Sequence, residues 1–240
     1  MKYRVRHLTK YQYNSPVTLC YNMTHLLPRN TASQHCVQRR ITVTPMPVYQ
    51  NEGYDYFGNL TFYFSIQVPH DTLTIEMESE LDIDEINHAD LLHSHSLTCG
   101  EYRQQLHESG TPELRMAKEY LLDSSLIRRS ERLACYAADI FHDDAPVIQA
   151  AAALTHRIFE EFTFDPIATS VSTPPEQVLQ EKRGVCQDFA HLAIACLRSV
   201  GLPARYISGY IETLPPEGQE KLVGTDASHA WFAIFIPDAG

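Results

Sequence analysis

The sequence predicts an α+β protein in which an antiparallel β domain is followed by a helical region with a small sheet. Two observations carry this prediction: apolar residues alternate with a period of two within the first 85 residues, and helical periodicity takes over afterwards. Hydrophobic residues make up 44% of the chain and charged residues 20%, as in ordinary globular proteins. We therefore expect an N-terminal β domain at residues 1–85 and a helical region at 86–240, with the core proper at about 145–240.

The strand pattern is clearest between residues 60 and 68, where every second side chain is apolar: Leu60, Phe62, Phe64, Ile66 and Val68. The alternation resumes at residues 73–78, after a turn, and another strand is expected around residues 37–43. One apolar and one polar face predict strands buried on one side, as in a β-sandwich.

Helices are expected at residues 112–122, 130–141, 145–162 and 185–200, with a short one beginning after Thr173, the expected N-cap. The last of these ends at Gly201, which precedes a proline by two residues. Residues 87–110 are polar and predict irregular structure. Strands at 204–210 and 229–236 close the chain, and the second is apolar on both faces, which is typical of a central strand covered on both sides.

Charge and composition exclude several classes of protein. The net charge is 19 − 30 = −11, which disfavours binding to nucleic acid or to an anionic membrane. No segment approaches the roughly 20 apolar residues of a membrane span, and the N-terminus lacks the apolar core of a signal peptide. We expect a cytoplasmic protein whose six scattered cysteines are reduced thiols without disulfides.

Cys186 and His229 are the candidates for chemistry. Cys186 lies at the start of a predicted helix, where free N–H groups and the helix dipole favour the thiolate. Alone, it is more simply a small apolar residue at a helix start, and a histidine at a strand end, such as His229, is usually structural or merely exposed. Together they predict a catalytic pair, because a helix N-terminus and a neighbouring strand can bring a thiolate and an imidazolium within about 4 Å.

The chain resembles the bacterial transglutaminase-like family in three ordered blocks: Gly184-Val185-Cys186-Gln187-Asp188-Phe189-Ala190-His191, Gly201-Leu202-Pro203-Ala204-Arg205-Tyr206-Ile207-Ser208-Gly209-Tyr210 and Ala227-Ser228-His229-Ala230-Trp231. Residues 1–85 resemble the β domain that precedes the core in that family. The resemblance implies a papain-like fold, a Cys-His-Asp triad and acyl transfer through a thioester. In that scheme Cys186 is the nucleophile and His229 the general base and acid.

The third member of that triad is missing from the pattern. The resemblance places the acid on the strand after the histidine strand, but the chain ends 240 − 229 = 11 residues past His229. We therefore expect a C-terminally truncated core whose triad acid lies beyond Gly240. Asp226 and Asp238 are the nearest carboxylates and are weak candidates.

Other residues near these blocks have simpler interpretations. Asp188 is expected to stabilise the helix N-terminus rather than to act on substrate. His191 falls on a polar stripe of the helix, which predicts contact with solvent or a hydrogen bond to a neighbour. Tyr210 and Trp231 are expected mainly in the core, although either could line a cleft.

No cofactor or metal is expected. His88, His93 and His95 cluster in the polar segment, but no acidic or cysteine ligand stands at a fixed offset from them.

The leading functional hypothesis is a cysteine enzyme that cleaves or transfers amide bonds of a peptide or protein: a protease, an amidase or a transglutaminase. The alternative is a non-catalytic binding or scaffolding protein that retains the fold, because loss of a triad acid can cost about 10⁴ in rate. A redox-sensing Cys186 is a weaker hypothesis, since no resolving cysteine lies nearby in the sequence.

Overall fold

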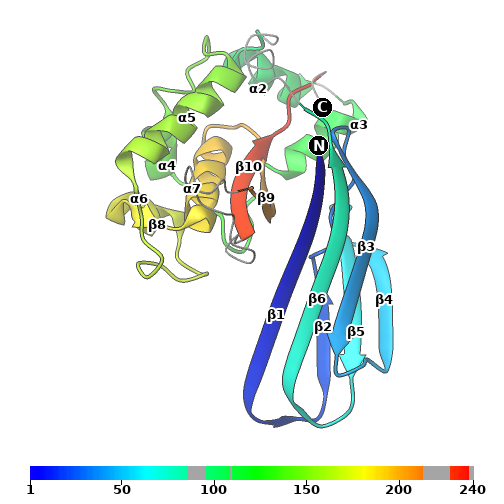
Figure 1. Ribbon diagram of the computed structural model, residues 1–240. Coiled ribbons are helices and arrows are strands. Elements are labelled where there is room, and N and C mark those ends of the chain that lie inside the picture. The colour runs from blue at the N-terminus through cyan, green and yellow to red at the C-terminus, as the bar shows by residue number, and fades with distance from the viewer. Residues whose placement is uncertain (86–95, 109, 213–227, 238–240) are drawn as a thin grey trace, which may run out of the picture. The chain divides into compact units, whose positions relative to one another are not determined.

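The structure is a computed structural model that describes residues 1–85, 96–108, 110–212 and 228–237. The chain divides into two compact units, Met1–His88 and Ala89–Gly240. Strands form the first unit, and helices with short strands form the second (Figure 1). The predicted α+β class is confirmed.

The first unit contains two three-stranded antiparallel sheets, which form two layers in Figure 1. One sheet has the order β1-β6-β3, with β1 at Lys2–Val17, β6 at His70–Ile83 and β3 at Gln34–Thr44. The other has the order β2-β5-β4, with β2 at Cys20–Thr24, β5 at Leu60–Ile66 and β4 at Tyr49–Tyr54.

Apolar alternation places the core of this unit. On β6, Leu73, Ile75 and Met77 are buried, while the intervening Glu76 and Glu78 form ion pairs with arginines of the neighbouring strands. On β5 the polar positions 61 and 65 are buried as well. The expectation of one buried and one wet face is therefore wrong for this strand.

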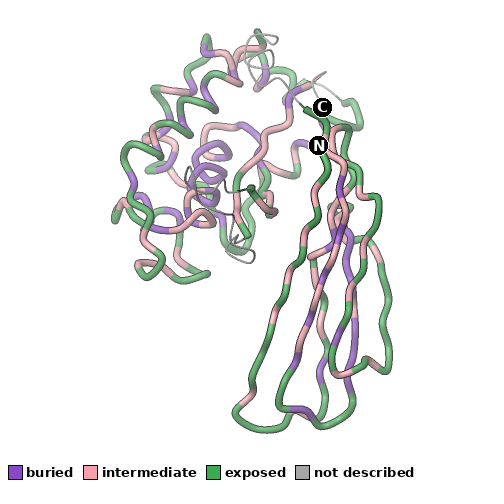
Figure 2. Tube along the Cα trace, viewed as in Figure 1, coloured by how far each residue is buried: buried purple, intermediate pink, exposed green. Residues whose placement is uncertain are grey.

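The second unit is built around α7, which is purple over most of its length in Figure 2. Its elements are α2 (Cys99–Glu108), α3 (Pro112–Glu119), α4 (Glu131–Ala137), α5 (Val147–Glu161), β7 (Thr163–Phe164), α6 (Pro175–Glu181), β8 (Arg183–Gly184), α7 (Cys186–Ser199), β9 (Ala204–Tyr210) and β10 (Ser228–Ile234). No helix in the described ranges is long and apolar enough to cross a membrane.

Helix α2 lies in the segment expected to be irregular, so that expectation is wrong. The helix buries Cys99, Tyr102 and Leu106, a spacing of three and four residues. Its start is fixed by Thr98, whose backbone N–H and hydroxyl both donate to the Glu101 carboxylate, at 2.9 and 3.0 Å. The Thr-x-x-Glu pattern of a capping box is readable in the sequence and predicts this start.

Two local expectations also need correction. Pro174, not Thr173, is the N-cap of α6; the Thr173 hydroxyl instead accepts the backbone N–H of Ser170 at 2.9 Å. Strand β10 pairs with β9 alone among the described strands, and Trp231 is 37% exposed. The apolar residues on both faces of β10 therefore do not make it a central strand in the described part of the sheet.

Helix α7 is apolar on nearly every side, and the rest of the unit encloses it. Leu192, Ile194 and Leu197 have no exposed surface. The helix is followed by Gly201 at φ +82°, a conformation that side chains with a Cβ rarely adopt. Arg198, in the last turn, donates hydrogen bonds to the carbonyl oxygens of Leu122 and Ala204, at 2.7 and 2.9 Å. These bonds satisfy a buried guanidinium and fix the path from α7 into β9.

Candidate active site

Cys186 is the first residue of α7, as predicted. Its side chain is half-buried, in contrast with the fully enclosed body of the helix. The preceding residues, Arg183 and Gly184, form the short strand β8, which pairs in parallel with β7. Val185 then turns the chain from extended into helical backbone, with φ −113° and ψ 175°. The thiol thus lies where backbone N–H groups are not used inside the helix and where the dipole favours negative charge.

The Asp188 carboxylate fixes this helix start. Its Oδ2 atom accepts the backbone N–H of Val185 at 2.8 Å and the hydroxyl of Thr169 at 2.6 Å. The side chain is 1% exposed, and a buried carboxylate is tolerated only when such donors surround it. The expectation that Asp188 stabilises the helix N-terminus is therefore confirmed.

Gly184 leaves the room that Asp188 needs. A Cβ atom at Gly184 would lie 2.7 Å from Oδ2 and 2.9 Å from Cβ of Asp188. Both distances are shorter than side chains normally tolerate. The glycine two residues before Cys186 is thus required by packing against the carboxylate.

His229 is the second residue of β10, which pairs with β9 in an unbroken antiparallel register. His229 stands opposite Gly209, and Phe232 stands opposite Tyr206. Because side chains alternate along a strand, His229 shares a face with Trp231, and Phe232 shares the other face with Tyr206.

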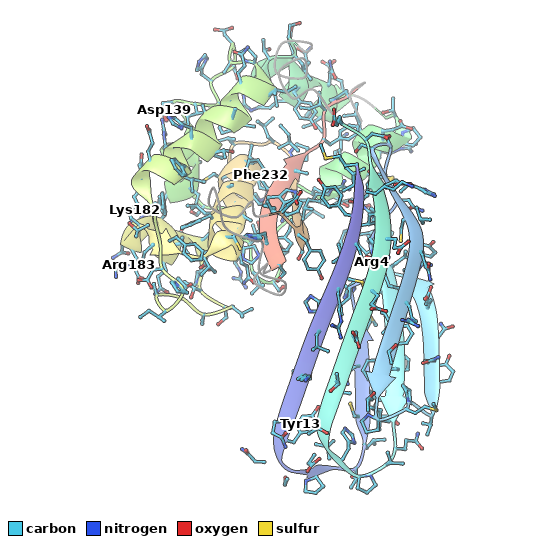
Figure 3. All side chains as sticks on the ribbon, in the orientation of Figure 1. Arg4, Tyr13, Asp139, Lys182, Arg183 and Phe232 are labelled. Atoms are coloured by element: carbon cyan, nitrogen blue, oxygen red, sulfur yellow. The ribbon has the colours of Figure 1, made fainter. Side chains whose placement is uncertain are left out.

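The face of Phe232 is the one that meets α7. Phe232 and Ile234 pack against the core that contains this helix, and Figure 3 labels Phe232 on β10 beside it. His229 itself is half-buried at the start of β10, three residues before Phe232. Between the described residues Cys186 and His229 there is no hydrogen bond joining thiol and ring. Their assignment as nucleophile and base stays a prediction.

The rings of Tyr206 on β9 and His191 on α7 lie against each other between the strand and the helix. The two rings lie 5.2 Å apart, centroid to centroid. Burial raises the pKa of Tyr206, and the nearby Cys186 thiol raises it further. Sequence reasoning missed Tyr206, although its even spacing from buried Ala204 on β9 was a usable signal.

The expectation that His191 lies on a polar stripe is wrong, because the residue is only 6% exposed. Burial lowers the pKa of His191, opposed in part by the Asp188 carboxylate. The helix face that carries polar residues by sequence is covered by β9.

Among the remaining candidates, Trp231 is a third exposed and lies across Gly209, so it is not a core residue. Asp226, Asp238, His88, His93 and His95 lie outside the described residues.

The other thiols differ from Cys186 in their surroundings. Burial raises the pKa of Cys99, and it raises the pKa of Cys196 to about 12. Cys135 is exposed and is not the first residue of a helix. It is therefore the natural reference for an ordinary accessible thiol.

Comparisons with known proteins agree with this architecture. Residues 3–82 match the family described as bacterial transglutaminase-like N-terminal region, and residues 135–240 match the transglutaminase-like superfamily. An uncharacterized protein of Mycobacterium tuberculosis is 37% identical over 236 residues, covering 98% of this chain and 74% of the relative. A protein-glutamine gamma-glutamyltransferase of Pseudomonas aeruginosa is 32% identical over 93 residues, covering 37% of this chain and 14% of that protein.

A solved structure supports the fold. The crystal structure of a "Putative Cysteine Protease" from Cytophaga hutchinsonii superposes with a TM-score of 0.73 at 23% identity, covering 99% of this chain and 73% of that one. The resemblance found in the sequence is thereby confirmed for the family and the fold.

The contact between Gly184 and Asp188 predicts a selective loss of stability. Gly184→Ala should lower the free energy of unfolding of the second unit by about 1–3 kcal/mol, since the added methyl group meets a buried carboxylate that two hydrogen bonds hold in place. Urea unfolding followed by the fluorescence of Trp231, the only tryptophan, reports on this unit. Gly110→Ala is the matched control, because nothing lies within 4 Å of that position; it should change stability by less than about 0.5 kcal/mol. Equal effects of the two substitutions would contradict the account.

The buried His191 predicts a pH dependence. Its folded pKa lies below the unfolded value near 6.5, so the unfolded chain binds the proton first as pH falls, and the folded state loses stability below about pH 6.5. The same fluorescence assay at pH 7.5 and pH 5.5 should show a smaller loss for His191→Gln than for the wild type. An identical pH dependence in both proteins would show that the ring is not shielded from water.

Proposed function

Because this chain belongs to the transglutaminase-like superfamily, we propose that it is a cysteine-dependent acyl-transfer enzyme with Cys186 as nucleophile and His229 as base and acid. The observation that carries the proposal is the position of the thiol: it is half-buried on the first residue of a helix whose start is fixed by a buried carboxylate. Helix N-termini are among the places where proteins lower a thiol pKa.

The proposed reaction proceeds in two halves. His229 takes the proton of the Cys186 thiol, and the sulfur attacks the carbonyl carbon of an amide. The C–N bond breaks, the imidazolium gives its proton to the departing amine, and a thioester remains on Cys186. The backbone N–H of Cys186 is the first candidate to stabilise the oxyanion that forms in between.

The second half fixes the reaction type. Attack of water on the thioester gives hydrolysis of a peptide or isopeptide bond, whereas attack of an amine gives transglutamination. The similarity of 93 residues to a glutamine gamma-glutamyltransferase supports the amide side chain of glutamine as one acyl donor. The proposed substrate is therefore a peptide or protein.

A second candidate function is a binding or scaffolding protein. Its support is that the described structure contains no hydrogen bond between Cys186 and His229, which the enzyme requires at some stage of its cycle. The two functions differ in one respect that can be measured: only the enzyme needs the imidazole to alter the reactivity of the thiol in solution.

Alkylation at pH 6 distinguishes the two. An ordinary thiol with a pKa of about 8.5 is less than about 1% ionised at that pH, whereas a thiol paired with imidazolium is mostly ionised. Iodoacetamide should therefore label Cys186 at least about tenfold faster than exposed Cys135, with peptide mapping by mass spectrometry reporting all six cysteines. His229→Ala should remove most of this advantage. Equal labelling of the two cysteines, unaffected by His229→Ala, would favour the scaffold.

A further inference from the structure

The loop of residues 166–174, between β7 and α6, lies beside the start of α7. Two hydrogen bonds of this segment, and a third from the adjacent Asp165, reach residues on both sides of Cys186. The backbone N–H of Asp165 donates to the Gly184 carbonyl at 2.9 Å, and the Thr169 hydroxyl donates to Asp188 at 2.6 Å. The Gln187 side-chain amide donates to the Val171 carbonyl at 3.2 Å. The loop is thus held next to the thiol by the same carboxylate that fixes the helix start.

The loop also has a shape of its own. The Asp165 carboxylate accepts the backbone N–H of Ile167 at 3.1 Å, and the Thr173 hydroxyl accepts that of Ser170 at 2.9 Å. A further backbone bond runs from the Thr173 N–H to the Ser170 carbonyl. Polar groups of the loop thus bond to one another, while its apolar side chains at positions 167 and 171 are exposed.

Two of these side chains are unusually exposed. Ile167 is 90% exposed and Val171 is 71% exposed, and neighbouring Phe164 on β7 is 64% exposed. A single exposed apolar residue needs no explanation, but two in one segment that is anchored beside Cys186 are available to contact a ligand.

The composition of the loop favours an uncharged ligand. None of the nine residues 166–174 is ionisable, although the whole chain carries 19 + 30 = 49 charged residues among 240. The nearby cavity of about 330 Å³ that Glu161, Lys182 and Arg183 help to line is charged, and Figure 3 labels its two cations. Those cations are already paired, Lys182 with Glu161 and Arg183 with Asp165. The loop, in contrast, offers exposed apolar surface next to Cys186.

We propose that loop 166–174 is a specificity surface, at which Ile167 and Val171 bind an uncharged, apolar side chain of the acyl-donor peptide beside the carbonyl attacked by Cys186. This inference rests on the proposed function, because it assumes that a peptide carbonyl comes to the thiol. The anchoring through Thr169 and Asp188 then keeps the apolar contact at a fixed distance from the sulfur.

Peptide-like alkylating probes test the surface without requiring turnover. The 240-residue chain is treated with iodoacetyl-Leu-Leu-amide and with iodoacetyl-Gly-Gly-amide, and the rate of labelling of Cys186 is followed by peptide mapping. Both probes are uncharged, so the net charge of the protein affects them equally. We expect the leucine probe to react about tenfold faster, the order of discrimination that an apolar contact supplies. The same ratio at Cys135 should be close to one.

The double variant Ile167→Ser/Val171→Ser should bring the ratio at Cys186 close to one. The matched control is Met116→Ser/Leu122→Ser, which also removes two apolar residues that are more than half exposed; the Leu122 carbonyl accepts a bond from Arg198, at the other end of α7. This control should keep the wild-type ratio. Thermal unfolding checks that both variants remain folded.

The outcomes separate the two proposals. Rapid labelling of Cys186 by plain iodoacetamide, together with equal rates for the two peptide probes, would overturn the specificity surface and leave the nucleophile in place. Labelling of Cys186 no faster than Cys135 by plain iodoacetamide would overturn the proposed function itself. A leucine preference that survives the double variant would assign the apolar contact to other residues and would also overturn the inference.

Discussion

One buried carboxylate organises the region around the candidate nucleophile. Asp188 accepts a backbone N–H from Val185 and a hydroxyl hydrogen from Thr169 through the same oxygen atom, and Gly184 is small because that carboxylate lies against it. Removing a carboxylate from water is costly unless donors replace the water, so each of these neighbours is constrained by the others. The position of Cys186, the path of β8 and the attachment of loop 166–174 all depend on this one group.

The rest of the second unit holds that group in place. Helix α7 is surrounded by apolar side chains, so it cannot rotate without exposing Leu192 or Leu197. At its far end, Arg198 binds carbonyl oxygens of two segments and leads the chain into β9, which carries Tyr206 back toward the thiol. A rigid helix with an accessible first turn is a suitable support for a nucleophile, because the body resists movement while the end stays open to substrate.

The sequence predicted the features that depend on local patterns and family motifs. It did not predict those that depend on contacts between separate segments of the chain. The first residue of α7 and the role of Asp188 follow from helix-end chemistry, and α2 could have been found from its Thr98–Glu101 capping box. The burial of His191 could not be found in this way, because it depends on how β9 folds back onto the helix that precedes it. The pairing of His229 with Gly209 likewise depends on the register between β9 and β10, which no single strand encodes.

The central claim, that Cys186 is a nucleophile, is tested most directly by trapping the acyl group on it. The protein is incubated with p-nitrophenyl acetate, and its peptides are mapped by mass spectrometry before and after treatment with neutral hydroxylamine. The account predicts one acetyl group on Cys186, removed by hydroxylamine as a thioester should be, and absent from the Cys186→Ala variant. Acetyl groups distributed over Cys135 and surface lysines, with none enriched at Cys186, would contradict it.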